Sequence, residues 1–533
     1  MARGEIRTIS FVSLGCPKNL VDSEKMLALL AEDGLVPVAP TDGDGVTPAD
    51  AVVVNTCGFL EASKEESLRV LTEAIREKEA GRVKRVVVAG CLVQRHRAKM
   101  LEWAPGIDAM VGVFDRDRIV EAVRGPAGGK GRSLPGTEAP RYWIAANALS
   151  AAKDRGMATA SLTVNGKDGR GIGYWEDDSA RVRLTPRHYA YLRVSEGCNQ
   201  NCAFCTIPSI RGKMRSKPLE AVEREARELL HDGAFELLLI GQDTTSYGED
   251  IGAGVRPDGS GGLPALLRGV SRAVEETTGR AWVRLMYAYP SNFSGAMIGA
   301  LAEVSAGVAD GSPRAGHVVP YIDIPLQHAS DRMLGSMRRN VSASRQRDLI
   351  RELRERIPGM AVRTTLIAGF PGETEEDHQE VVRFVKEMRF EALGVFEYSR
   401  EAGTPAGRME GDASLAVPAE VKARRREEIM LAQQEVAFAR AASRVGQRLN
   451  VLIDTPLRST GRATAGVGKG GGLYSGRAYF QAPQVDAVTF VQARERLSPG
   501  ELVACEVTGS DGYDLVARPV DDAEKRTRLR VVK

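Results

Sequence analysis

Long apolar segments are absent from this chain of 533 residues. Nowhere do 18 apolar residues follow one another, so a membrane-spanning helix is not expected. The segment from Met1 to Arg7 also lacks the apolar core of a signal peptide. We therefore expect a cytoplasmic protein without a membrane partner.

A strong charge of either sign is absent as well. The 73 Lys and Arg residues nearly balance the 70 Asp and Glu residues, and the net charge of +3 gives no strong signal for nucleic acid. With 43% hydrophobic and 27% charged residues, the composition excludes a disordered or collagen-like chain. The length predicts several domains, each large enough to bury its own core.

Cysteine is scarce, with seven residues, and in a reducing compartment these favour metal binding or catalysis over disulfides. Three of them lie in the first 115 residues, where β-rich and helical segments alternate and predict a parallel α/β domain. Strands are expected at Thr8–Leu14, Ala51–Val54, Arg85–Ala89 and Ala109–Val113, with a helix at Glu61–Glu79.

Cys16, Cys57 and Cys91 directly follow the first, second and third of these strands. The carboxyl ends of parallel strands meet at one edge of a sheet, so the three thiols should converge there. Because thiolates are soft ligands, we expect a shared metal ion or cluster. Packing of small buried cysteines is the alternative.

Cys198, Cys202 and Cys205 form a C-x3-C-x2-C run after a predicted strand. Such a run suits a [4Fe-4S] cluster with one iron left free of protein ligands. Structural zinc is the alternative, but it requires a fourth ligand, for which His188 is the nearest candidate. Cys505 lies alone in an alternating strand pattern and is expected to pack in a core.

From residue 189 a β-then-α rhythm repeats six times and predicts a partial (β/α)6 barrel, with function at the carboxyl ends of its strands. The strands are expected at Tyr189–Val194, Phe235–Ile240, Ala281–Tyr287, Tyr321–Leu326, Ala361–Ala368 and Phe390–Tyr398, with helices at Leu219–His231 and Glu373–Met388. The loop at Gly369 either lets a ligand approach the backbone or is a plain turn into a helix that begins near Thr374.

A long charged helix, Ala419–Arg444, leads to a β-rich segment that predicts a small five-stranded barrel. Residues 445–518 hold eight Lys or Arg against seven Asp or Glu, which weakens an RNA-binding interpretation.

The basic loop Arg211–Lys217 is either a contact for an acidic substrate or a solvated surface. The glycine-rich stretches Gly125–Pro186, Asp250–Gly262 and Gly461–Gly472 are expected to be loops or insertions. The chain is predicted to divide into five parts: an N-terminal α/β domain (1–124), a linker or insertion (125–186), the partial barrel with the long helix that follows it (187–444), the small β-barrel (445–518) and a charged tail (519–533).

These motifs closely resemble those of the methylthiotransferases of the radical S-adenosylmethionine superfamily. The resemblance covers nearly the whole chain, with motifs that begin at Gly15, Asn55, Cys198, Gly241, Asp323, Gly369 and Tyr474. The sequences Cys16-Pro-Lys-Asn, Asn55-Thr-Cys-Gly-Phe and Gln242-Asp-Thr are most similar to those of the RimO branch. The C-terminal barrel would then be a TRAM domain, which is OB-like.

The resemblance implies a radical-generating [4Fe-4S] cluster on Cys198, Cys202 and Cys205, and an auxiliary [4Fe-4S] cluster on Cys16, Cys57 and Cys91. Candidate contacts for S-adenosylmethionine are Gly241, Gln242, Asp243 and Gly369, because all four follow strands. The implied reaction adds a methylthio group to the β-carbon of an aspartate in ribosomal small-subunit protein twelve. The motifs identify neither the electron donor nor the sulfur donor. A tRNA adenosine methylthiotransferase is the alternative, and a zinc-holding RNA-binding protein is a more distant one.

Overall fold

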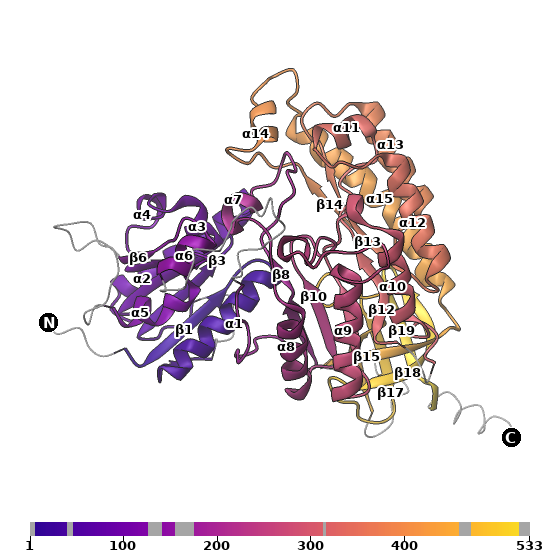
Figure 1. Cartoon of the computed structure of the whole chain (residues 1–533), viewed down its shortest axis with the longest axis horizontal. Helices are drawn as coiled ribbons and strands as arrows, with labels where there is room; N and C mark the ends of the chain where they lie inside the picture. The colour runs from indigo at the N-terminus through magenta and orange to yellow at the C-terminus, as the bar shows by residue number, and fades with distance from the viewer. Residues whose placement is uncertain are drawn as a thin grey trace.

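The computed structural model describes residues 6–39, 46–125, 141–154, 175–312, 316–457 and 471–521. Figure 1 shows an N-terminal α/β part on the left, a larger sheet with its helices at the centre and right, and a β-barrel at the lower right. Among the described helices, none has both the length and the apolar character that a membrane span requires.

The N-terminal part is built on a sheet of parallel strands in the order β2-β1-β3-β4-β5-β6. The strands are β1 (Thr8–Ser13), β2 (Val36–Pro37), β3 (Ala51–Thr56), β4 (Arg85–Gly90), β5 (Ala109–Val111) and β6 (Arg141–Trp143). Every residue of β3 and β4 is buried, as the continuous valine runs of both strands require of central strands covered on two faces.

Helices cover both faces of this sheet. They are α1 (Pro17–Glu32), α2 (Glu61–Glu79), α3 (Cys91–His96), α4 (Lys99–Trp103), α5 (Ile119–Arg124) and α6 (Ala148–Asp154), with a 3-10 turn η1 at Arg116–Arg118. Val70, Leu71 and Ala74 of α2 pack on Val52 and Val54 of β3, while Met26 and Leu30 of α1 belong to the core of the opposite face. The sheet therefore has two cores.

The central part carries six parallel strands among the described residues, in the order β14-β13-β12-β11-β10-β7. They are β7 (Tyr189–Arg193), β10 (Glu236–Ile240), β11 (Trp282–Leu285), β12 (Val318–Asp323), β13 (Ala361–Ala368) and β14 (Ala392–Glu397). The order follows the sequence and the outer strands do not pair with each other, so the sheet is a partial barrel, as predicted.

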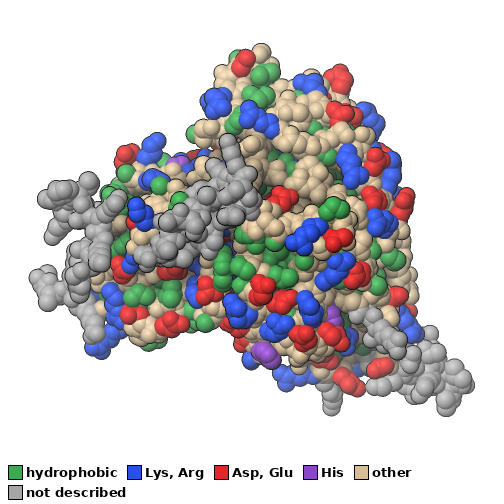
Figure 2. Space-filling view, viewed as in Figure 1, with side chains coloured by type: hydrophobic (Ala, Val, Ile, Leu, Met, Phe, Trp, Pro, Cys, Tyr) green, Lys and Arg blue, Asp and Glu red, His purple; other side chains and the backbone are tan. Residues whose placement is uncertain are grey.

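The outer face of this sheet is covered by helices. They are α8 (Leu219–His231), α9 (Gly262–Thr277), α10 (Gly295–Ser305), α12 (Ala343–Arg356), α13 (Glu375–Met388) and α15 (Ala419–Ser443). Three short helices lie elsewhere: α7 (Ile207–Arg211) contacts α3, while α11 (Asp331–Ser336) and α14 (Pro405–Met409) share a small core with Ala203. The 3-10 turns are η2 at Glu249–Ile251 and η3 at Pro290–Asn292. Alternate strand residues divide between the two faces: Ala190 and Leu192 join the helix-side core, whereas Tyr189 and Tyr191 face inward. Figure 2 shows Lys and Arg intermixed with Asp and Glu over the helices of the face in view.

The C-terminal part is a closed barrel of antiparallel strands with one parallel pairing, in the order β15-β16-β17-β19-β18. The strands are β15 (Arg448–Leu457), β16 (Gly472–Arg477), β17 (Thr489–Ala493), β18 (Leu502–Asp511) and β19 (Asp514–Pro519). Cys505 is fully buried in its interior, as expected. The predicted fold class of an α/β domain, a partial barrel and a small β-barrel is confirmed.

The small barrel packs on the inner face of the central sheet. Leu452 and Phe480 join Tyr189 and Trp282 in one core. Beneath this core the Glu236 carboxylate accepts a bond from Nε of Arg284 at 2.6 Å and is paired with Arg477 of the small barrel. Because all three of these side chains are buried, the salt-bridged contact fixes the barrel against the early parts of β10 and β11.

Several segments differ from the expectations. The strand expected at Tyr321–Leu326 is observed at Val318–Asp323 and includes Pro320, a residue that interrupts most central strands. The stretch expected to be a linker or insertion carries β6 and α6, and in its described end at 175–186 Asp178 accepts hydrogen bonds from Arg116 of η1 and Arg193 of β7. Of the stretch expected at Gly461–Gly472, residues 461–470 lie outside the described residues. Thr374 is the N-cap of α13, with a capping box to Asp377, as the loop prediction allowed.

The basic loop Arg211–Lys217 is not a solvated surface, which corrects that expectation. Arg211, Arg215 and Lys217 are all buried. Each is paired with a carboxylate that is distant in sequence. Such pairs cannot be recognised from the sequence of the loop itself. The loop belongs to a larger buried cluster, which we call the interdomain ion network. Among the described residues it comprises Asp22, Glu24, Arg116, Glu176, Asp178, Arg181, Arg193, Glu196, Arg211, Arg215, Lys217 and Glu225, and no side chain in it is more than 7% exposed.

The interdomain ion network joins three parts of the chain. Asp22 of α1 bonds Arg116 of η1 and Arg193 of β7, and Asp178 of the 175–186 segment bonds the same two arginines. Burial alone would raise the pKa of Asp178, but Arg193 and the other adjacent cations hold it well below its usual value. The carboxylate is therefore ionised in the folded protein.

We expect Asp178→Asn to destabilise the fold by about 3–5 kcal/mol, because it leaves three buried cations without one of their anions. Denaturant unfolding of the variant and the wild type measures the difference. Glu303→Ala is the matched control: it breaks an exposed pair with Arg268 and should cost no more than about 1 kcal/mol. An Asp178 variant as stable as the Glu303 variant would contradict the assignment.

Candidate functional site

One cavity of about 580 Å³ is lined by all six cysteines that the sequence singles out. It lies where the N-terminal part meets the carboxyl edge of the central sheet, and its other walls include residues of β13 and β14 and of the segments that follow β10, β11, β12 and β14. The volume is in the range of small-molecule sites in proteins. The two sets of cysteines, distant in sequence, therefore face the same space.

Cys16, Cys57 and Cys91 are held at this edge by the strand ends. Cys16 is the N-cap of α1, Cys57 follows β3, and Cys91 is the first residue of α3 after β4. Gly15 has φ +90°, and a Cβ there would lie 2.7 Å from Cβ of Cys57. Glycine is thus required for these two cysteine loops to approach each other.

Cys198, Cys202 and Cys205 lie on a loop that the barrel anchors at several points. The backbone N–H of Cys198 donates to O of Gly212 at 3.1 Å, and that of Cys205 donates to O of Cys202 at 3.1 Å. Gln200 Nε2 donates to Asp243 Oδ2 at 2.8 Å, which fixes the loop to the segment after β10. The loop therefore holds three sulfurs toward one cavity.

Cationic donors approach one sulfur of each set. Nε of Arg211 donates to Sγ of Cys91 at 3.3 Å, and Nη1 of Arg339 donates to Sγ of Cys202 at 3.4 Å. Burial raises the pKa of Cys91, Cys198 and Cys205 to about 12, so these thiols need a positive partner to ionise. Two groups of three soft donors, each with a guanidinium beside one sulfur, fit iron–sulfur clusters.

Lys18 also lines the cavity, two residues after Cys16. Its ammonium lies 3.1 Å from the centre of the Tyr287 ring. Burial lowers its pKa to about 8, which leaves the group mostly protonated at neutral pH. Tyr287 itself has φ +60°, a conformation that aromatic residues rarely adopt.

Of the four predicted contacts for S-adenosylmethionine, Gln242 lines the cavity. Its Nε2 donates to Glu196 at 2.7 Å, while its Oε1 has no partner among the described residues. Asp243 is buried and bonds Gln200, Thr245 and Ser246, so it supports the cysteine loop from behind. Gly241 and Gly369 lie outside the cavity lining: Gly241 is next to Ser195, and the N–H of Gly369 donates to Glu373.

No histidine lies among the described residues that line the cavity, which is relevant to a zinc site. His188 bonds Asp454 of the small barrel at 2.8 Å, away from the cysteines. His328 is fully buried, and its Nδ1 accepts a bond from the backbone N–H of Ser330. A four-ligand zinc tetrahedron in this cavity would therefore lack a histidine.

The cavity is also lined by Arg339, Tyr289 and Gln327, none of which was predicted as a contact for a cofactor. The guanidinium of Arg339 lies 4.1 Å from the Tyr289 ring centre, and the Tyr289 hydroxyl is 3.7 Å from Sγ of Cys202. Gln327 has φ +76°, and its Oε1 has no partner in the described part of the chain. Tyr289 and Gln327 follow strand ends, and this position is the sequence feature that could have identified them. Arg339 lies in the loop after α11, and no sequence feature indicates that it reaches the cavity.

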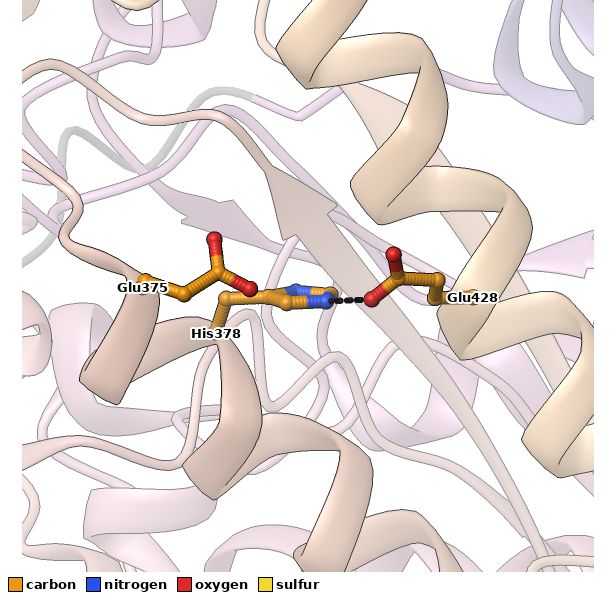
Figure 3. Close-up of side chains that lie close together, drawn as sticks. All are labelled: Glu375, His378 and Glu428. Atoms are coloured by element: carbon orange, nitrogen blue, oxygen red, sulfur yellow. Dashed lines mark hydrogen bonds and ion pairs between the residues drawn. The ribbon is translucent and has the colours of Figure 1, made fainter.

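A second group of metal-ligand types lies far from this cavity, on the helix layer. Figure 3 shows the His378 ring between Glu375 and Glu428, with a bond of 2.6 Å from its Nε2 to Glu428. Arg424 already pairs with both glutamates, at 2.8 and 2.7 Å. A metal ion would have to displace that guanidinium, so we assign the group to the packing of α13 on α15.

Family comparisons agree with this geometry. The chain matches the models of Uncharacterized protein family UPF0004 over residues 8–112, the Radical SAM superfamily over 192–257 and 304–385, and the TRAM domain over 445–520. It is 38% identical over 508 residues to the ribosomal protein uS12 methylthiotransferase RimO of Anaeromyxobacter sp. (strain K), covering 95% of this chain and 92% of the relative. The RimO of Pelotomaculum thermopropionicum is 38% identical, with 96% and 99% covered. The chain belongs to the RimO family of methylthiotransferases.

A RimO-family enzyme is a radical S-adenosylmethionine protein, so a [4Fe-4S] cluster and S-adenosylmethionine are its cofactors. Among solved structures, the radical S-adenosylmethionine methyltransferase TsrM from Kitasatospora setae shares the fold, with a TM-score of 0.50, 16% identity and 75% of each chain covered. The family resemblance predicted from the cysteine motifs is confirmed.

We expect Gly15→Ala to reduce the iron bound per chain after anaerobic reconstitution, because the added Cβ displaces Cys57. Gly34→Ala is the matched control: Gly34 has φ +82° but no atom within 4 Å of an added Cβ, so it should cost about 1 kcal/mol of stability and no iron. Equal iron contents of the two variants would show that the approach of Gly15 to Cys57 is not needed.

Proposed function

We propose that this protein transfers a methylthio group to the β-carbon of an aspartate in ribosomal protein uS12. The observation that carries the proposal is the single cavity lined by both sets of three cysteines. Relatives that match nearly the whole chain are named as uS12 methylthiotransferases, which supports the same substrate. The protein is proposed to act in the cytoplasm, where the ribosome lies.

We assign two [4Fe-4S] clusters to the cavity, one on Cys198, Cys202 and Cys205 and an auxiliary one on Cys16, Cys57 and Cys91. When bound and reduced, the first cluster would supply an electron for cleavage of S-adenosylmethionine, and the auxiliary cluster would supply a site for the sulfur to be transferred. Each cluster would be held by three cysteines of this chain.

The protein's own side chains hold and orient these groups. Arg211 and Arg339 place positive charge beside one sulfur of each set, which favours the thiolate forms that metal binding needs. The Oε1 atoms of Gln242 and Gln327, for which the described residues offer no partner, are acceptors for N–H groups of a bound molecule. Phe204, Ile210 and Phe396 contribute apolar walls, which limit the side reactions of a radical with water.

A tRNA substrate has less support. The chain is near neutral as a whole, and residues 445–518 carry eight Lys or Arg against seven Asp or Glu. Binding to a nucleic-acid backbone relies on a concentrated positive surface. A zinc-holding RNA-binding protein has still less support, because three thiols of each set and no histidine line the cavity in the described part of the chain.

The substrate test uses reconstituted enzyme, S-adenosylmethionine and a reductant, with uS12 and unmodified tRNA in parallel. We expect the mass of uS12 to increase by one methylthio group in place of hydrogen, at one aspartate, and the tRNA to remain unchanged. Mass spectrometry of the digested products measures both. Methylthiolated adenosine in the tRNA with unmodified uS12 would overturn the proposal.

Replacing Cys198, Cys202 and Cys205 together by Ala should abolish 5′-deoxyadenosine formation and leave about half of the iron. The same replacement of Cys16, Cys57 and Cys91 should leave about half of the iron and retain 5′-deoxyadenosine formation, but abolish methylthio transfer. Cys505→Ala is the control for loss of a buried thiol and should change neither, since Cys505 lies inside the small barrel. If the Cys198 set can be removed without loss of 5′-deoxyadenosine, the two assignments are wrong.

A further inference from the structure

Lys18 differs from Arg211 and Arg339 in that no acceptor for its charged group lies among the described residues. Arg211 bonds Glu196 and Asp22, and Arg339 bonds Cys202 together with the backbone oxygen of Pro325. Within the described residues, the ammonium of Lys18 has no hydrogen bond or ion pair, and it lies over the Tyr287 ring. A buried cation with three donor hydrogens and no acceptor is costly unless a ligand supplies the acceptor.

The carboxylates that face Lys18 are already paired with arginines. Glu196 accepts bonds from Arg193 at 2.7 Å and Arg211 at 2.6 Å. Asp323 accepts a bond from Nη1 of Arg363 at 2.8 Å. Cys16 also faces Lys18, but no hydrogen bond or ion pair joins the two side chains in the described part of the chain, so the ammonium keeps its donor hydrogens for a group that enters the cavity.

The placement of Lys18 relates this charge to the reaction. Lys18 lies in the first turn of α1, whose N-cap is Cys16, and its ammonium is held over a tyrosine with a left-handed backbone. The β-carbon of an aspartate is bonded directly to the carboxyl carbon, so a substrate that brings its β-carbon to this cavity also brings a carboxylate. That carboxylate needs a positive partner when it leaves water.

We propose that Lys18 binds the side-chain carboxylate of the substrate aspartate and makes the enzyme specific for an acidic side chain. The inference rests on the proposed function and adds to it the residue that recognises the substrate. The ion pair fixes the carboxylate, and with it the orientation of the adjacent β-carbon toward the sulfurs. A neutral asparagine lacks the charge and is bound less tightly.

The test measures binding and modification with full-length, anaerobically reconstituted enzyme. The enzymes are the wild type, Lys18→Met, Lys18→Arg and the control Lys25→Met, which removes a lysine from the same helix where it bonds Ser179. The ligands are uS12 and a uS12 variant with Asn at the modified aspartate. The readouts are the Kd for each ligand, the iron content, and 5′-deoxyadenosine formed without uS12.

The wild type should bind uS12 roughly 10- to 100-fold more tightly than its Asn variant, as expected for one charge-assisted hydrogen bond. Lys18→Met should bind both ligands equally, with unchanged iron and 5′-deoxyadenosine. Lys18→Arg should retain most of the preference, and Lys25→Met all of it.

Two results would overturn the role of Lys18. One is equal binding of the two ligands by the wild type, a result that does not depend on whether any enzyme variant folds. The other is a Lys18→Met enzyme that loses iron or 5′-deoxyadenosine before uS12 is added, since Lys18 would then serve a cofactor. If the wild type methylthiolates uS12 in either case, only the role of Lys18 fails. If the wild type leaves uS12 unmodified, the proposed function fails and this inference with it.

Discussion

The structure depends on the interdomain ion network, because this network decides which surfaces of the two α/β parts face each other. Arg211 is its key member: it follows the Cys205 loop of the central part, and it bonds Cys91, Asn19 and Asp22 of the N-terminal part. Taking so many charges out of water is costly, and only good geometry offsets the cost. A slipped interface would leave buried charges unpaired, so the network stabilises one relative orientation much more than its alternatives.

That orientation has a chemical consequence. Each set of cysteines lies on the carboxyl edge of a parallel sheet, and the interface brings the two edges together around one cavity. In the function proposed above, a group held at one set would reach a substrate activated at the other without leaving the protein. The same arginine that bonds Glu196 also donates to Cys91, so the contact that aligns the two parts also affects the charge at one sulfur.

The sequence predicted those features whose cause is local. Cysteine spacing, strand rhythm and the capping residue Thr374 are read from short segments, and the six cysteines do lie on one cavity. Whether a residue at a strand end faces the cavity depends on neighbouring segments. Gln242 lines the cavity, whereas Asp243, the next residue, bonds Thr245 and Gln200 and so supports the cysteine loop. Asp178, Arg193 and Arg211 could not be recognised as a network, because their partners lie up to 189 positions apart. Lys18 belongs to a motif that the sequence analysis noted, but the lack of an acceptor for it among the described residues is a property of the folded cavity.

The small barrel has a defined part in this arrangement. It packs on Tyr189 and Trp282, which begin β7 and β11, and it is fixed there by Glu236, Arg284 and Arg477. The cavity is lined by Tyr287, Gln327 and Tyr398, which follow the strands. The barrel thus covers the inner face toward the amino ends of the strands, and the N-terminal part covers it toward the carboxyl ends. Arg477 of the barrel is paired with Glu236 of the sheet, so its positive charge is not available to a partner. The rest of the barrel is near neutral, which suits binding to a protein surface better than binding to a polyanion such as RNA.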